Sequence, residues 1–357
     1  MSLTANQQMP SSGNLAEVWQ SFRDDNPKVR IRDAAQALGV SEAELIATRC
    51  GDGVTRLRGD WGTLIKSVAT IGEVMALTRN DNAVHEKIGV YNNVRIMGKM
   101  GLVLDKEIDL RIFLSQWHHA FSVTEDTKSG ERHSLQFFNA SGAAIHKIYL
   151  TDGSDFAVYK EIVEQYISDN QSTDIEVTAK PTAEVEIADS EVDVEAFRSE
   201  WRGLQDTHDF FDLQNRYKLS RTQALRLGGS EFARQTDPEL FEEFMQSLAD
   251  ACQSIMIFVG NKGMIQIHTG PVCKLKRVGP WFNVLDERFN LHLRDDAIDS
   301  AWVVRKPTVD GDVTSLELFD VDGEVIAYIF GERKPGLAEL PEWRQMVNAL
   351  PTIEQTA

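Results

Sequence analysis

The chain has 357 residues, of which 42% are hydrophobic and 26% charged, so its composition excludes collagen-like, coiled-coil and wholly disordered proteins. Its 37 basic and 55 acidic side chains give a net charge of −18, which repels nucleic acid and anionic lipid and makes neither an expected partner. The length predicts two domains.

The N-terminal segment and the cysteines predict a cellular location. Residues 1–14 lack the basic and apolar segments of a signal peptide, and no apolar run approaches the roughly 18 residues of a membrane span. Cys50, Cys252 and Cys273 are odd in number and widely spaced, which predicts neither a disulfide framework nor a thiolate zinc site. We expect a cytoplasmic protein without membrane insertion, in which residues 1–14 form a disordered tail.

Helical patterns come first along the chain and strand patterns follow. Apolar residues recur every three or four positions over 15–22 and 31–50, and Ser41 opens a capping box. The later run SLQFFNASGAAIHKIYL, residues 134–150, alternates apolar and polar residues around a glycine turn, which predicts a hairpin. Helices followed by antiparallel strands predict an α+β fold.

Residues 171–195 form an acidic segment between two parts of the chain. They include eight acidic residues, one lysine and one proline, with few large side chains that could anchor a core. This composition predicts a flexible, self-repelling linker.

The sequence on the two sides of the linker repeats at a spacing of 181 residues. Between residues 98 and 150, about 15 of 53 positions are identical to those 181 residues later, without a gap. We interpret the chain as a tandem duplication, with an N-terminal repeat at 15–170 and a C-terminal repeat at 196–350. Common nucleotide-binding and zinc-protease motifs (GxGxxG after a strand, GxxxxGK[ST], HExxH) are absent from the sequence.

The C-terminal repeat contains a histidine that could bind a metal. His208 follows Asp206 and Thr207, an expected N-cap pair, and a helix N-terminus favours a neutral imidazole with a free lone pair. The adjacent Phe210 and Phe211 could form an apolar wall for a planar metal cofactor. The alternative is that His208 only begins a helix and that the aromatic residues are core.

Several cations could bind the carboxylates of such a cofactor. Arg111 stands where the second repeat has His292, the kind of difference expected when one repeat donates a polar group to a site. Arg221, Lys306 and Arg333 are candidates for holding carboxylates, although each could instead be a solvated surface charge.

The sequence resembles the HemS/ChuS/PhuS-type haem-utilisation proteins of Gram-negative bacteria. The resemblance rests on the duplication and on VHEKIG around His85, DLRIFLSQWHHAF, QDTHDFFDL, GNKGMIQIHTGPV, AWVVRKPT and IFGERKPG. It covers essentially the whole chain except the tail and the linker. It implies two similar halves, each with a nine-stranded antiparallel sheet and packed helices, and a haem b site.

The resemblance also implies roles for individual residues. His208 would be the proximal iron ligand, and Arg111 would be the distal arginine, which is the catalytic residue if the protein is an enzyme. His85 would make a secondary haem contact. Four further residues would lie near the porphyrin edge: Arg221, Lys306, Tyr328 and Arg333. Two departures from relatives are Asp209, where some have a further histidine, and Phe330, where some have a tyrosine.

Three functions follow as hypotheses. The favoured one is a cytoplasmic protein that accepts imported haem, from an inner-membrane haem importer, and passes it to a haem oxygenase for iron release. The second is a haem-degrading enzyme that uses an external electron donor, since the sequence shows no flavin or NAD site. The third is a DNA-binding regulator acting through the short helices around GVSEAEL, against which the acidic charge argues.

Overall fold

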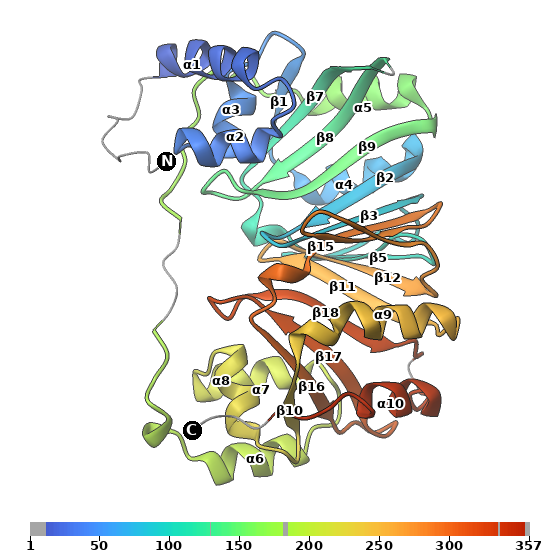
Figure 1. Ribbon diagram of the computed structural model, residues 1–357. Helices are drawn as coiled ribbons and strands as arrows, with labels where there is room; N and C mark the ends of the chain where they lie inside the picture. Colours follow the sequence, from blue (N-terminus) through green and yellow to red (C-terminus); the bar gives the residue numbers. More distant parts are fainter. Residues whose placement is uncertain (1–11, 129, 181–184, 335, 354–357) are drawn as a thin grey trace.

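The computed structural model describes residues 12–128, 130–180, 185–334 and 336–353, and shows two large antiparallel sheets with helices around them (Figure 1). In spatial order the first sheet contains β1 (Val54–Leu57), β7 (His119–Thr127), β8 (Gly130–Phe138), β9 (Ala144–Ser154), β2 (Gly72–Arg79), β3 (Ala83–Gly89), β15 (Phe289–Arg294), β14 (Trp281–Leu285) and β13 (Leu275–Val278). The second contains β10 (Ala233–Thr236), β16 (Ser300–Lys306), β17 (Val313–Phe319), β18 (Val325–Gly331), β11 (Ile255–Asn261), β12 (Met264–Gly270), β6 (Asp109–Phe113), β5 (Met100–Leu104) and β4 (Arg95–Met97). The α+β class and the duplication are confirmed.

Each sheet combines strands from both halves of the sequence. Six strands of each sheet come from one half and three from the other, because β3 pairs with β15 and β12 pairs with β6. This exchange was not expected from the sequence. The sheets therefore do not follow the division of the chain at 15–170 and 196–350, whose exact boundaries stay a prediction.

The helices occupy equivalent places in the two halves. The first half contributes α1 (Ser12–Asp25), α2 (Ile31–Leu38), α3 (Glu42–Ala47), α4 (Trp61–Val68) and α5 (Phe156–Tyr166). The second half contributes α6 (Val194–Arg202), α7 (Asp209–Tyr217), α8 (Arg221–Gly228), α9 (Phe241–Asp250) and α10 (Pro341–Asn348). Figure 1 shows α1–α3 at one end of the molecule and α6–α8 at the other. Within the described residues, every helix is too short or too polar to cross a lipid bilayer.

Glycine and a polar side chain close the predicted hairpin in each half. The turns hold Gly142 and Gly323 at φ angles of 75° and 74°, in the left-handed region that favours glycine. The side chains of Asn139 and Asp320 accept backbone N–H groups across the same turns. Local sequence therefore explains both hairpins, β8–β9 and β17–β18.

Two equivalent asparagines join the halves where the sheets pack against each other. Asn80 and Asn261, spaced by 181 residues, each donate side-chain hydrogen bonds of 2.8–3.3 Å to backbone carbonyls of strands from the other half or of the neighbouring strand. The acceptors are Gly260, Val325 and Ile326 for Asn80, and Arg79 and Ile145 for Asn261. Gly260 and Ile326 stand 181 residues after Arg79 and Ile145, so the interface has an approximate twofold symmetry.

The acidic linker and the tail differ from their predictions. The linker is attached at both ends in its described parts: the Gln171 side chain bonds the backbone of Arg56 on β1, and Asp189 pairs with Arg226 on α8. Three of its acidic side chains, Glu186, Asp189 and Glu195, pair with Arg226 or Arg198. Residues 1–11 of the predicted tail lie outside the described residues, and α1 begins at Ser12.

Candidate functional site

His208 lies at the start of α7 with its side chain in solvent. It is the N-cap residue itself, its imidazole is 87% exposed, and its Nδ1 lies 2.5 Å from Oδ1 of Asp206. A carboxylate only accepts hydrogen bonds, so Nδ1 donates to Asp206 and Nε2 is the ring nitrogen outside this contact. Asp206, predicted as part of an N-cap pair, instead orients this ring, as carboxylates do for metal-binding histidines.

The aromatic residues that follow His208 have different surroundings. Phe210 is 1% exposed and stacks edge-on against Trp201 at 4.3 Å between ring centroids, so it belongs to the core. Phe211 is 65% exposed beside the histidine. Only one of the two aromatic residues is therefore free to contact a ligand.

The outer face of the second sheet, on which α6–α8 pack, carries the other predicted residues. Antiparallel partners project to the same face, and one row of partners runs from Asp109 through Ile267, Phe258 and Tyr328 to Glu317. Within this part of the row, two acidic residues flank three apolar or aromatic ones. Along this row four strand spacings separate β6 from β17, a distance of about 19 Å.

The centre of this face is a partly exposed apolar surface. Met256, Phe258, Ile265 and Phe330 are each intermediate in exposure and lie on β11, β12 and β18. An apolar area of this kind, flanked by charged groups, suits a planar hydrophobic ligand with polar edges.

Arg221 and Lys306 lie on this face, but they pair with a buried carboxylate. Arg221 makes two hydrogen bonds of 2.7 and 2.9 Å to separate oxygens of Glu317, and Lys306 Nζ donates to Glu317 at 2.9 Å. Glu317 is fully buried, and Ser315 donates to it as well. The two cations thus compensate an internal acid, which differs from their prediction as free carboxylate clamps.

The protonation of this group follows from burial and from the paired charges. Burial opposes ionisation of Glu317, but Arg221 and Lys306 more than offset it and hold its pKa at about 2. Burial lowers the pKa of Lys306 to about 8, because the attraction of Glu317 only partly compensates. Tyr328 lies under Arg221 at 5.4 Å, and burial raises its pKa to about 12, so it stays a neutral hydroxyl.

Arg333 is the predicted cation with a donor left over. Its Nη1 atom is buried and has no hydrogen-bond partner among the described residues. The positive charge of Arg333 also contributes to lowering the pKa of Asp206, an effect dominated by the backbone N–H of His208. The structure therefore brings Arg333 near the residue that orients His208, with an unused N–H to offer a ligand.

Arg111 lies on the same outer face, on a strand that the first half contributes. Its register partner on β12 is Ile265, and its guanidinium is 29% exposed and paired with Asp109. Burial raises the pKa of Asp109, and Arg111 opposes this shift. Arg111 and the His208 region thus belong to different halves of the sequence but to one face of one sheet.

His85 lies elsewhere, so its predicted contact has no support in this arrangement. It is fully buried between the two sheets, 4.9 Å from the Phe289 ring and close to His268. Neither ring nitrogen has a hydrogen-bond partner among the described residues. The alternation of β3 turns His85 inward, whereas a residue on the outer face would be needed.

A family model described as "Haemin-degrading HemS.ChuX domain" matches the chain twice, over residues 39–166 and 218–350. This chain belongs to that family.

Members of the HemS.ChuX family with close similarity span nearly the whole chain. "Hemin transport protein HemS" from Yersinia enterocolitica is 40% identical over 95% of this chain and 98% of its own length. Holo-PhuS, a haem-binding protein from Pseudomonas aeruginosa, is 42% identical with a TM-score of 0.94, covering 96% of this chain and all of PhuS. ChuS, described as an E. coli heme oxygenase, is 36% identical with a TM-score of 0.86, covering 94% and 99%.

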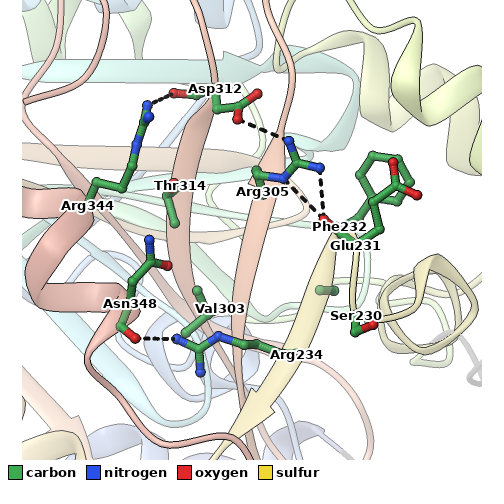
Figure 2. A pocket seen from close by; sticks show the side chains of 11 residues that line it. Ser230, Glu231, Phe232, Arg234, Val303, Arg305, Asp312, Thr314, Arg344 and Asn348 are labelled. Carbon is green, nitrogen blue, oxygen red and sulfur yellow. Dashed lines mark hydrogen bonds and ion pairs between the residues drawn. The ribbon is translucent and has the colours of Figure 1, made fainter. Parts of the chain in front are cut away.

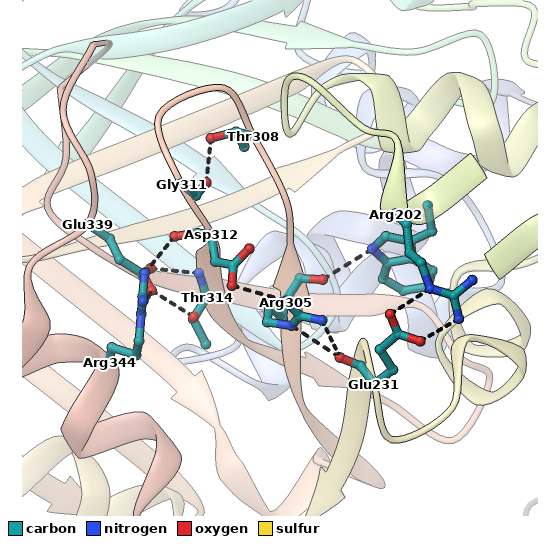
Figure 3. A network of polar contacts seen from close by, with 10 residues as sticks. Arg202, Glu231, Arg305, Thr308, Gly311, Asp312, Thr314, Glu339 and Arg344 are labelled. Carbon is teal, nitrogen blue, oxygen red and sulfur yellow. Dashed lines mark hydrogen bonds and ion pairs between the residues drawn. The ribbon is translucent and has the colours of Figure 1, made fainter. Parts of the chain in front are cut away.

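A cavity of about 170 Å³ lies behind β16, on the face opposite Lys306 (Figure 2). Three arginines line it, but their donors are engaged: Arg305 bonds Asp312 at 3.0 Å, Arg344 bonds Glu339, and Arg234 bonds carbonyls at the end of α10. Figure 3 shows Arg305 also bonded to the backbone of Glu231. This network fixes β16 and thereby the strand position of Lys306.

Sequence reasoning missed Glu317, Asp206 and Asp109 as parts of the site. Glu317 stands in SLELF at an alternate position of a strand, where a charged residue usually faces solvent. Its equivalent in the first repeat is Gln136, a difference of charge that could have marked it.

Proposed function

We propose that this protein binds haem b through His208 and carries it in the cytoplasm between import and iron release. The observation that supports this most is the exposed imidazole of His208, whose Nε2 is free because Asp206 holds Nδ1. Neutral imidazole is the usual protein ligand of haem iron, and a carboxylate partner fixes its orientation.

The residues around His208 suit the rest of the haem molecule. Phe211 and the partly exposed apolar area at Phe258 and Phe330 offer contact surface for the macrocycle. Arg333, with its unpaired Nη1, is the cation we assign to a propionate. Arg111 would supply the polar group on the side of the first half, with its charge partly balanced by Asp109.

Arg221, Lys306 and Tyr328 have a supporting role in this proposal. Their bonds and ring contacts around Glu317 are internal, so they shape the edge of the face and hold α8 on the sheet. We assign them to positioning α7 and α8, and leave the propionates to Arg333.

The proposed partners follow from the direction of transport. An inner-membrane haem importer would supply haem, and a haem oxygenase would accept it. The name of the Yersinia relative, a hemin transport protein, and the haem-binding description of PhuS support a carrier.

Haem titration of the wild type beside His208→Ala tests the proposal. We expect the variant to lose most of its haem affinity and to shift its visible spectrum, because no other described residue offers a comparable exposed and oriented imidazole at this face. His118→Ala, which removes another exposed histidine, is the matched control and should match the wild type. Identical spectra for the wild type and His208→Ala would reject His208 as the ligand.

A haem-degrading enzyme remains the second candidate, supported by the similarity to ChuS. In that case Arg111 would be the catalytic residue, and the electrons would come from an external donor. The haem complex with an external reductant, air and catalase separates the two functions. Loss of the Soret band with stoichiometric iron and CO release identifies the enzyme; haem transfer to an acceptor without CO identifies the carrier.

The DNA-binding hypothesis is not favoured by the structure. The helix that would read DNA, α3, has six residues, and five of them are buried against the first half. A recognition helix must present its side chains to a groove, so α3 cannot serve as one without unpacking.

A further inference from the structure

The outer face of the second sheet continues beyond Arg111 to the free edge of the sheet. Arg111 pairs with Leu102 on β5, which pairs with Arg95 on β4. In the next row, Phe113 pairs with Met100, which pairs with Met97. Since antiparallel partners share a face, all of these side chains project to the same side as the proposed haem site.

Two methionines dominate this extension. Met97 is 55% exposed and Met100 is 46% exposed, so both residues are open to solvent. The other face of the hairpin is occupied: Ile96 lies against α4, where a Cβ on Gly62 would come within 3.1 Å of it, and Val103 is buried. The exposed methionines therefore lie on the outer face of the sheet and not on the face that packs against α4.

Cations accompany the methionines. Arg95 is exposed and lies in the same row as Arg111, two strand spacings or about 10 Å away, with Leu102 between them. An apolar strip with two cations beside it matches an amphiphilic anion with a flat hydrophobic body.

The equivalent hairpin of the first sheet lacks the methionines but keeps a cation, since the exposed Lys276 stands 181 residues after Arg95. At a spacing of 181 residues, Val278 and Trp281 replace Met97 and Met100. Val278 is 55% exposed like Met97, whereas Trp281 is only partly exposed, so the two hairpins differ in chemistry at both positions and in exposure at the second. Trp281 lies under Arg294 at 5.7 Å, and Arg294 pairs with Asp296.

We propose that Met97 and Met100 form a transfer site where haem rests on its way to and from the His208 site. The inference rests on the proposed function. A thioether is a neutral, polarisable ligand that binds haem iron in c-type cytochromes, and two of them on an exposed edge can hold haem briefly without trapping it. Arg95 would receive a propionate there, and the continuous apolar face would lead past Arg111.

Rapid-mixing measurements on the full chain test this transfer site. Haem association is followed with monomeric ferric haem, and haem release with an excess of apomyoglobin, for the wild type and for Met97→Leu/Met100→Leu. Leucine keeps the apolar surface and removes only the sulfur. We expect both rates to fall on the order of threefold or more, with the equilibrium Soret spectrum and the affinity unchanged, because a resting site affects both directions equally. Val278→Ala is the matched control and should keep both rates.

Wild-type rates in the leucine variant would overturn the proposal, and so would a changed Soret spectrum of the loaded protein, which would make a methionine a ligand at equilibrium. Failure of the proposed function has a different signature: the wild type would then bind no haem, or would bind it equally well after His208→Ala.

Discussion

The outer faces of the two sheets have the same framework but different buried charges. In each half the first residue of the third helix reaches the sheet and forms a buried ion pair. In the first half it is Glu42, paired with Lys147 on β9; in the second it is Arg221, paired with Glu317 on β17. Burial alone would lower the pKa of Lys147, but Glu42 more than offsets this and raises it. The two ion pairs stand at different positions of the repeat, because Glu42 and Lys147 correspond to Gln223 and Tyr328, and Arg221 and Glu317 correspond to Val40 and Gln136.

The difference that matters for binding is outside that ion pair. The loop between α1 and α2, residues 26–30, contains no histidine, whereas α7 begins with the exposed His208. Where the second face has Arg111, the first has His292, whose Nδ1 bonds Asn283 at 2.6 Å. The two scaffolds therefore differ in a few exposed residues, and among the described residues the exposed, carboxylate-paired imidazole at a helix start belongs to the second face, where we propose that it binds iron.

The largest effect is expected at Glu317. Glu317→Gln gives the second face the amide that the first face has at Gln136, but it leaves Arg221 and Lys306 buried beside a neutral group. Breaking a buried pair in this way costs about 3–5 kcal/mol of unfolding free energy. Urea unfolding measures this loss. Glu200→Gln is the control, because Glu200 forms an exposed ion pair with Arg216 and its loss should change the free energy of unfolding little. Equal stability of both variants would show that the ion pair is dispensable.

The buried histidines between the sheets make stability depend on pH. Burial lowers the pKa of His146 and of His268 to about 3 and lowers that of His85 as well. Below about pH 6.5, the ordinary pKa of histidine, these side chains bind protons in the unfolded chain but stay neutral in the folded chain. Each histidine therefore lowers the free energy of unfolding as pH falls, by about 1.4 kcal/mol per pH unit.

His85→Leu isolates one of these contributions. The imidazole of His85 has no hydrogen-bond partner among the described residues, so leucine should cost little at pH 7.5. Between pH 6.5 and 5 the loss of stability should be shallower than in the wild type by about 1.4 kcal/mol per pH unit. Urea unfolding across this range measures the slope, and parallel curves would contradict the assignment.

Asn80 and Asn261 test the symmetry of the interface directly. Each alanine substitution removes the side-chain donors to backbone carbonyls of the other half, three for Asn80 and two for Asn261, and should cost about 1–3 kcal/mol. Because two contacts of each asparagine are equivalent, the two losses should be of similar size. Thermal or urea unfolding measures the loss of stability in each variant. A clear difference between the two losses would show that the two asparagines contribute unequally to the interface between the halves.

The smallest effect on folding, and a specific effect on binding, is expected at Asp206. Asp206→Asn leaves an exposed turn intact but lets the His208 ring rotate, so haem affinity should fall on the order of tenfold while the unfolding curve stays in place. Haem titration measures the affinity. Unchanged affinity would show that Asp206 does not orient the ligand.

Sequence patterns predicted what depends on local chemistry and on the repeat. The capping box at Ser41 has both of its hydrogen bonds with Glu44, and both predicted hairpins close on glycine. The exchange of strands was not predictable in this way, because strands such as β3 and β15 have alternating patterns that permit pairing within or between halves. Which strands pair is decided only by contacts between residues that are far apart in the sequence.

For the candidate site too, the sequence predicted local features but not long-range contacts. The position of His208 at a helix start was readable from the residues around it. The inward direction of His85 was not, since alternation along β3 does not say which face packs on the other sheet. Likewise, Arg221 and Lys306 meet Glu317 only because three distant segments converge, so their pairing has no local signal.

The most direct test of the difference between the two faces is the number of haem molecules that bind tightly per chain. Stoichiometric titration with haem, followed at the Soret band, should give one high-affinity site in the wild type and none in His208→Ala. Two equivalent sites in the wild type, or one site that survives in His208→Ala, would contradict the account.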